Sequence, residues 1–341
     1  MLCVEHNKPV VYKDSDVMGT LVFKEVDKNL AKDLVIKNHY SHKWASNFGV
    51  VNVGVFRQSD LATCLGVASF GWMMFPRAYK SIASNIGREE ILELNRLWVD
   101  DCLGKNTESM LLSASWKILK WYGKVRVVQS FADGRLGCGT IYKASNFKYY
   151  GVAKTSFLIE NTTGEIWFGG MFVKTCSPKT MLELGKKFCK NELTPIVVNS
   201  YRYLYVLDKT VNILLKEQPY PEYQKGEIYV DKDIIFKQLP STFGGETRGC
   251  AQGLFRDYII GKVLGDEEAC YYISKKLLEF YDETAINTIF NEQKENETLK
   301  QKFYNKHKNI FEITDWYTLL VMDSKNDSVK ENVITKVDLW D

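Results

Sequence analysis

The stretch ELNRLWVDDCLGKNTESMLLSASWKILKWYGKVRVVQSFADGRLGCGTIYKASNFKYYG, residues 93–151, decides the fold. Its apolar spacing alternates between the patterns of strands and of helices. The expected elements are a strand over 92–99, a helix that opens at 106–109, a strand over 125–131 that ends at Asp133, and a Gly-rich turn over 134–139 that leads into a second helix. Because free backbone N–H groups and the helix dipole make a helix N-terminus an anion site, this β–α–β–α unit predicts a phosphate-bearing ligand beside a strand.

Further strands and helices are predicted on both sides of this unit. Before it, the sequence predicts strands over 20–26, 48–56 and 64–72, a helix over 30–38 capped by Asp27, and a mixed loop over 75–90 that covers the site. After it, the sequence predicts a hairpin over 154–160 and 165–172, a helix over 180–190 and a strand over 195–206. The expected fold class is α/β (α+β), with a mixed central sheet flanked by helices.

The pattern changes after residues 219–226, where we predict a domain boundary. The two expected domains are residues 1–225 and an acidic accessory region over 226–341, since 341 residues can hold two domains of ordinary size. In the second domain, glycines at 244–245 and 249–253 predict loops, 266–290 has helical spacing, and 294–308 is highly charged. This region is expected to be a mainly helical extension, and no motif in it indicates a function.

Bulk properties favour a soluble protein of the cytoplasm. The hydrophobic content is 45%, and no apolar run approaches the roughly 20 residues of a membrane span. The first residues lack the basic and apolar regions of a signal peptide. Eight cysteines are scattered without a CxxC pair, which predicts reduced thiols rather than a zinc ribbon.

The net charge of +3 hides an asymmetry between the two parts of the chain. Residues 1–225 hold 30 Lys and Arg against 21 Asp and Glu, whereas residues 226–341 hold 15 against 21. The positive net charge of residues 1–225 favours attraction of a polyanion such as nucleic acid, and it would equally suit a CoA-like ligand. Charge alone leaves both partners open.

Several strings in the first 225 residues resemble one known family. These are NHYS at 38–41, NRLWV at 95–99, KNTES at 105–109, SFAD at 130–133, GTIYKASNFKYYG at 139–151 and SYRYLY at 200–205. As an ordered set they resemble the phage Mom branch of the GCN5-related N-acyltransferase (GNAT) superfamily, over roughly residues 20 to 225. The resemblance implies a GNAT-like catalytic domain over 1–225 that binds acetyl-CoA or a related acyl donor. The superfamily's Gly-rich pyrophosphate loop is replaced here by LGKNTES at 103–109, so the donor itself is not identified.

Four residues are the predicted catalytic set: His39, Tyr40, Asp133 and Tyr142. Asp133 ends an apolar strand, where open α/β sheets bind ligands, and could orient or deprotonate an amine; the alternative is a turn-capping role. Tyr142 stands where the superfamily places the acid that protonates a leaving thiolate; alternatively it is a half-buried Tyr bonded to backbone. His39 and Tyr40 match the family's His-Tyr pair, and His is readily tuned to move protons. His39 and His42 with Asp133 could also form a metal site, although no metal is predicted.

Further residues are expected to bind the donor or the substrate. The predicted cofactor-binding residues are Leu97, Trp98, Val99, Lys105, Asn106, Thr107, Ser109, Gly137 and Gly139. The predicted substrate-binding residues are Arg96, Tyr149 and Arg202, because Arg pairs with carboxylate or phosphate and aromatic rings stack on extruded bases. For Tyr149 and its aromatic neighbours, a place in the core is the competing interpretation.

The resemblance implies an enzyme that modifies double-stranded DNA. It would attach a small acyl-derived group, acetamido or carbamoylmethyl, to the exocyclic amine of adenine in phage DNA, and so protect that DNA from restriction. It would act in the host cytoplasm. The alternatives are an acyl-CoA-dependent N-acyltransferase acting on a small amine or on an amine of a hypermodified pyrimidine, and a non-catalytic binding protein that kept the fold. The oligomeric state is left open.

Overall fold

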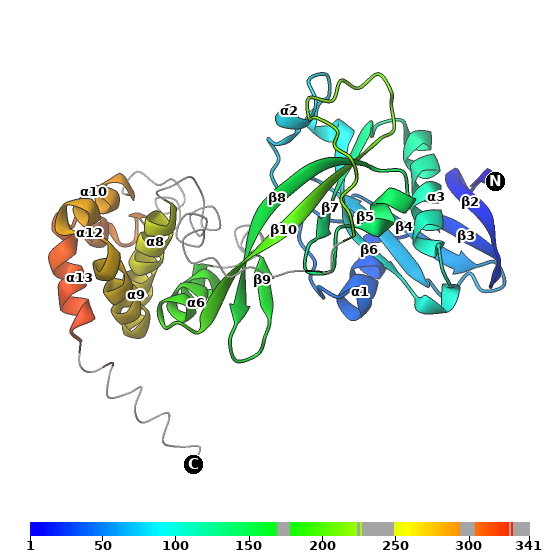
Figure 1. Cartoon of the computed structure of the whole chain (residues 1–341). Coiled ribbons are helices and arrows are strands. Elements are labelled where there is room, and N and C mark those ends of the chain that lie inside the picture. Colours follow the sequence, from blue (N-terminus) through cyan, green and yellow to red (C-terminus); the bar gives the residue numbers. More distant parts are fainter. Residues whose placement is uncertain (169–177, 224–225, 227–248, 294–303, 327–328, 330–341) are drawn as a thin grey trace, which may run out of the picture. The chain divides into compact units, whose positions relative to one another are not determined.

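The structure is a computed structural model, and it describes residues 1–168, 178–223, 226, 249–293, 304–326 and 329. The chain forms two compact units (Figure 1). Unit 1 comprises residues 1–155 and 198–228, and unit 2 comprises residues 156–197 and 229–341. The division into compact units thus groups residues 156–197 with the C-terminal helices. The boundary near residue 225 between a catalytic domain and an accessory region stays a prediction.

The strands form a mixed sheet in the order β1-β2-β3-β4-β5-β6-β7-β10-β8-β9. Their bounds are β1 Leu2–Glu5, β2 Lys8–Ser15, β3 Gly19–Glu25, β4 Val51–Arg57, β5 Gly66–Gly71, β6 Ile91–Val99, β7 Val127–Asp133, β8 Lys148–Glu160, β9 Ile166–Phe168 and β10 Leu193–Val206. The predicted α/β class with a mixed sheet is confirmed. The predicted first strand over 20–26 is the third, because a hairpin of β1 and β2 precedes it.

Two helices cover opposite faces of the sheet in unit 1. Side chains alternate along β3, so Leu21 and Phe23 pack against α3 (Thr107–Tyr122), while Val22 packs on the side of α1 (Lys28–Asn38). The predicted cap of α1 is confirmed, because the Asp27 carboxylate accepts from Leu30 N–H at 2.8 Å.

The sheet opens between β6 and β7. These strands are parallel, but they pair only where residues 91–93 meet residues 127–129. Beyond Glu93 and Gln129, β6 continues to Val99 and β7 to Asp133 without pairing with each other. The ladder of backbone hydrogen bonds between the two strands therefore stops at this opening, where the Leu94 carbonyl lies 3.2 Å from Ser130 Oγ instead.

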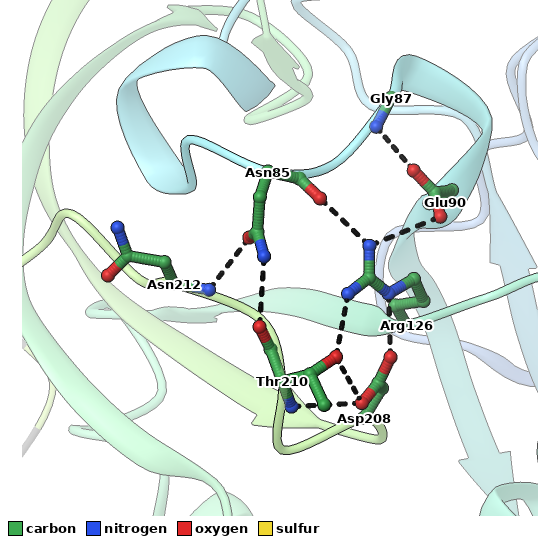
Figure 2. Close-up of polar contacts among 7 residues, drawn as sticks. All are labelled: Asn85, Gly87, Glu90, Arg126, Asp208, Thr210 and Asn212. Atoms are coloured by element: carbon green, nitrogen blue, oxygen red, sulfur yellow. Dashed lines mark hydrogen bonds and ion pairs between the residues drawn. The ribbon is translucent and has the colours of Figure 1, made fainter.

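Arg126, just before β7, anchors the segment that leads into β6. Its guanidinium donates to Asp208 Oδ2 at 2.8 Å, to Thr210 Oγ1 at 3.0 Å and to the Asn85 carbonyl at 2.8 Å, and it pairs with Glu90 at 3.4 Å. Figure 2 shows this network, which also joins Asn85 to Thr210 and to Asn212. The base of the predicted 75–90 loop is thus fixed at the end of β7 opposite to Asp133. The loop contains α2 (Tyr79–Ile82) and η1 (Arg88–Glu90).

Unit 2 is built around helices. They are α6 Pro178–Cys189, α8 Gly249–Leu264, α9 Glu267–Phe280, α10 Glu283–Gln293, α12 Lys308–Phe311 and α13 Trp316–Ser324. Their shared core includes Leu182, Phe255, Ile273 and Trp316. Among the helices that the structure describes, none combines the length and apolar character that a membrane crossing needs.

One prediction for the C-terminal region is wrong, and another is confirmed. Residues 249–253 form the first turns of α8 rather than a loop, because burial of Leu254 and Phe255 in the core outweighs the low helix propensity of glycine. The helical spacing over 266–290 is confirmed and corresponds to two helices, since Tyr281 adopts an extended backbone after α9. Most of the predicted charged segment 294–308, and residues 169–172 of the predicted hairpin, lie outside the described residues.

Candidate active site

A β-bulge in β6 places a carboxylate and a guanidinium on the same face of the sheet. Leu94 is opposite Phe70 while Arg96 is opposite Ser69, so Asn95 is the extra residue. Leu94 and Leu97 both pack into the core under α3. Glu93 and Arg96, which a regular strand would turn to opposite faces, are therefore both directed to the other face.

Glu93 is a functional candidate that our sequence analysis missed. Gln129 Nε2 donates to one carboxylate oxygen at 3.2 Å, and Asn95 Nδ2 donates to the other at 3.3 Å. Burial raises the pKa of Glu93, although these hydrogen bonds and the Arg96 charge oppose the rise. A raised pKa makes a carboxylate a stronger base, which suits it to accept a proton from a substrate. The only sequence signal was a Glu inside an apolar strand.

Arg96 is held by backbone carbonyls within this cluster. Its Nε donates to the Lys43 carbonyl at 3.1 Å and its Nη1 to the Asn95 carbonyl at 2.7 Å. The guanidinium lies over the Phe48 ring, 4.7 Å from the centroid. The predicted substrate-binding Arg96 is thus a fixed positive charge near the candidate catalytic residues.

His39 and Tyr40 follow α1 directly. The His39 ring is buried, and its Nδ1 accepts from Ser41 N–H at 3.1 Å, which assigns the neutral tautomer with the proton on Nε2. Burial lowers the pKa of His39 to about 3, and the Arg96 charge contributes. The Tyr40 ring lies against His39 with centroids 4.2 Å apart. His39 is therefore neutral at physiological pH and can donate through Nε2.

Tyr40 and Asp133 are brought together from distant parts of the chain. The Tyr40 hydroxyl donates a long hydrogen bond of 3.4 Å to Asp133 Oδ2. Arg135 holds the same carboxylate with Nε, 2.9 Å from Oδ1, and with Nη2. Although 53% of the Tyr40 residue is exposed, desolvation at its hydroxyl and the Asp133 charge raise its pKa, so the phenol keeps its proton.

Tyr142 reaches the opening from α4 (Thr140–Ala144). Its hydroxyl is hydrogen-bonded to Ser130 Oγ at 2.9 Å, and Ser130 Oγ lies 3.2 Å from the Leu94 carbonyl oxygen, beyond the last paired residues of β6, so the single Ser130 hydroxyl proton serves one of these two bonds. The ring stacks on Tyr203 with centroids 4.9 Å apart. Burial raises the pKa of Tyr142, which keeps a protonated phenol available as a hydrogen-bond donor or acid.

The N-terminus of α3 is suited to bind an anionic group. Asn106 has a left-handed backbone (φ 68°), and no described side chain caps the helix. Thr107 Oγ1 donates to the Leu103 carbonyl at 3.0 Å and Ser109 Oγ to the Asn106 carbonyl at 2.8 Å. Because these hydroxyls bond carbonyls, the first N–H groups are left for a phosphate, with exposed Lys105 beside them.

The other predicted donor-binding residues have two different environments. Leu97, Trp98 and Val99 are partly buried on β6, past the point where β7 diverges. Gly139 serves packing, because a Cβ there would lie 2.8 Å from the Tyr142 ring and 2.7 Å from Ala132. Gly137 has φ 130°, a conformation that favours glycine in the turn after Asp133.

The remaining predicted substrate-binding residues differ in position. Tyr149 is buried in the aromatic core with Tyr201 and Tyr203 and does not join the cluster. Arg202 lies over the Phe131 ring, 5.3 Å from the centroid; burial lowers its pKa, and the charge of Glu93 opposes this shift. Arg202 Nε is buried without a hydrogen-bond partner among the described residues, so this side chain has donor capacity in reserve.

The structure thus brings His39, Tyr40, Arg96, Asp133 and Tyr142 into one cluster with Glu93. His42 turns elsewhere, since its Nδ1 bonds the Ile36 carbonyl at 2.9 Å. Within the described residues, no group of three His, Cys, Asp or Glu side chains is arranged to hold a metal ion.

Comparisons with known proteins identify the family of this chain. The model of the Mom protein family matches residues 20–222. The methylcarbamoylase mom of Escherichia phage Mu is 30% identical over 200 residues, which cover 57% of this chain and 80% of that protein.

Solved acetyltransferases show a weaker likeness. A putative GNAT-family acetyltransferase from Desulfovibrio desulfuricans is 10% identical, with a TM-score of 0.30, and covers 55% of this chain and 99% of its own. Arabidopsis thaliana NAA60 in complex with acetyl-CoA is 12% identical, with a TM-score of 0.35, and covers 55% of this chain and 99% of its own.

The sequence similarity defines an enzyme of the transferase class. The chain belongs to the Mom protein family. The resemblance found in the sequence is confirmed.

Proposed function

We propose that this enzyme modifies double-stranded DNA by attaching a small acyl-derived group, of the acetamido or carbamoylmethyl kind, to the exocyclic amine of adenine. Membership of the Mom family and similarity to a methylcarbamoylase support this proposal. The observation that carries it is the convergence of His39, Tyr40, Arg96, Asp133 and Tyr142 at the opening of the sheet. In phage DNA the modification would protect against host restriction.

The reaction needs a proton acceptor for the amine and a donor for the leaving group. The N6 amine loses a proton as its new bond forms, and Glu93, with its raised pKa, is suited to receive it. Asp133, fixed by Arg135, orients the amine. The protonated Tyr142 hydroxyl supplies a proton to the leaving group, and neutral His39 donates a hydrogen bond through Nε2.

An acyl-CoA-type donor fits the α3 N-terminus. Lys105 and the first N–H groups of α3 would hold its phosphates. Leu97, Trp98 and Val99 would line its path along β6. Such a donor would supply the electrophilic carbon that the amine attacks, which must be the methylene carbon if the product is a carbamoylmethyl group, and its leaving group would depart from that carbon. Residues 1–225 would carry out the transfer in the host cytoplasm, with 226–341 as an accessory region.

Nucleoside mass spectrometry on plasmid DNA from cells that express the protein tests the proposal. We expect a new deoxyadenosine-derived nucleoside whose fragmentation places the added group on the base amine. A new nucleoside derived from another base, such as a pyrimidine, would contradict adenine as the target. An unaltered nucleoside profile would contradict DNA modification itself.

The uncapped N-terminus of α3 favours a second candidate function. A CoA-dependent N-acyltransferase would use the same donor site on a small amine, or on an amine of a hypermodified pyrimidine. Turnover of acetyl-CoA with polyamines or amino acids, in the absence of DNA, distinguishes this alternative.

A further inference from the structure

Two residues with large, exposed side chains are hydrogen-bonded to Asp133. Leu136 is 63% exposed and Tyr40 is 53% exposed. Leu136 N–H donates to the Asp133 carbonyl at 2.9 Å, and the Tyr40 hydroxyl donates to the Asp133 carboxylate. Both residues are therefore tied by hydrogen bonds to Asp133 of the proposed site. Folding gains little from the Leu136 side chain there, since apolar groups stabilise the folded state mainly when buried.

The turn that presents Leu136 is tightly held. Gly134 N–H donates to the Asn199 carbonyl at 2.8 Å, and a Cβ at Gly134 would lie 2.2 Å from that oxygen. Arg135 bonds Asp133 through its backbone N–H at 3.0 Å as well as through its guanidinium. These bonds fix the backbone on the N-terminal side of Leu136, so its apolar side chain projects from a rigid support.

The substrate explains why an apolar projection is useful here. The exocyclic amine of a paired adenine lies inside the base stack, so an enzyme that modifies it must extrude the base. DNA-distorting proteins insert Phe, Leu, Ile, Met or Pro between base pairs, because an apolar side chain replaces lost stacking contacts. Aromatic rings then hold the extruded base by stacking.

We propose that Leu136 is a wedge that enters the base stack of duplex DNA and fills the space of the extruded adenine. The exposed face of Tyr40 stacks that adenine beside Asp133. Leu136 is a positioning residue, since it acts on the duplex and not on the reacting atoms. This inference rests on the proposed function.

The test compares paired and unpaired substrates. Purified wild type, Leu136→Ala, Leu136→Phe and Leu214→Ala are each incubated with a synthetic duplex or with its single strand. Extract of the expression host is the source of the donor, and modified nucleosides are quantified by mass spectrometry. Leu214 is a matched control, because it is 53% exposed and its N–H bonds the Ile82 carbonyl, remote from Asp133 in the fold.

We expect Leu136→Ala to lower modification of the duplex about tenfold or more and to leave the single strand within about twofold, since only the duplex needs a wedge. Leu136→Phe and Leu214→Ala should retain duplex activity. If Leu136→Ala modifies the duplex as well as wild type does, or loses both substrates equally, the wedge is refuted while the proposed function stands. If the wild type modifies neither substrate, the proposed function fails and the wedge fails with it.

Discussion

At the scale of single residues, the Tyr142 hydroxyl is placed for one chemical task. It lies at the end of a short hydrogen-bonded chain that runs through Ser130 to the Leu94 carbonyl, at the opening between β6 and β7. Its ring is fixed independently by stacking on Tyr203. The hydroxyl can therefore be removed without loss of the packing.

Tyr142→Phe should lower DNA modification about 100-fold or more, because it removes the proton donor for the leaving group. Tyr149→Phe is the matched control, since Tyr149 is buried in the same aromatic core but does not join the cluster. Quantitative nucleoside mass spectrometry measures both variants. Equal losses in the two variants would mean that the core, and not the Tyr142 hydroxyl, limits activity.

His39 should make the stability of the protein depend on pH. Its pKa is about 3 in the folded state against 6.5 for an unperturbed His, so the unfolded chain binds a proton first as the pH falls below 6.5. Stability should fall by about 2 kcal/mol between pH 6.5 and pH 5 on this account. The free energy of unfolding of His39→Asn, measured with urea at pH 7 and pH 5, should fall less between these two pH values than that of wild type. An equal fall in both proteins would show that other groups control the pH dependence.

Single residues also show how far sequence reasoning reaches. His39, Tyr40, Asp133 and Tyr142 could be predicted because each stands in a family string or at a strand end. Glu93 could not, since its orientation depends on the bulge at Asn95, and a bulge is a property of the strand register.

At the scale of elements, the opening between β6 and β7 and the N-terminus of α3 define where a donor would bind. The sequence predicted β6, α3 and β7 in the right order. It could not predict that β6 and β7 separate after three residue pairs, because pairing is a contact between segments distant in sequence. The hairpin of β1 and β2 was missed for a different reason: its two-residue turn, His6-Asn7, lacks the Asn-Gly or Asp-Gly signal that marks such hairpins.

Lys105→Glu should weaken binding of acetyl-CoA about tenfold, because it replaces a cation beside the α3 N-terminus with an anion that repels phosphate. Lys120→Glu is the control at the other end of the same helix, and its dissociation constant should stay within about twofold. Calorimetric titration measures both. Unchanged binding in Lys105→Glu would move the donor site away from α3.

At the scale of the whole molecule, unit 2 is discontinuous in sequence. Leu182, Leu184 and Phe188 of α6 share a core with helices that lie after residue 249. Composition suggested a boundary near residue 225, because charge and motifs change there, but the packing partners of α6 cannot be inferred from composition.

A chain that ends at residue 226 should therefore expose the apolar face of α6, aggregate and bind a hydrophobic dye. A second variant, in which a short Gly-Ser linker joins Thr155 to Val198 and the chain ends at 228, should stay soluble and folded. The linker can be short because Thr155 Oγ1 and Ser200 Oγ are 2.8 Å apart. Size-exclusion chromatography and dye fluorescence measure aggregation and exposed apolar surface in both variants. A chain of residues 1–226 that stays soluble and does not bind the dye would contradict the grouping of α6 with the C-terminal helices.

The central claim is that the cluster around Asp133 modifies adenine in DNA. The most direct measurement is nucleoside mass spectrometry of plasmid DNA from cells that express either wild type or Asp133→Asn at equal levels. We predict a new adenine-derived nucleoside with the wild type and its loss, by about 100-fold or more, with Asp133→Asn. The same new nucleoside at the same level in both samples would contradict the account.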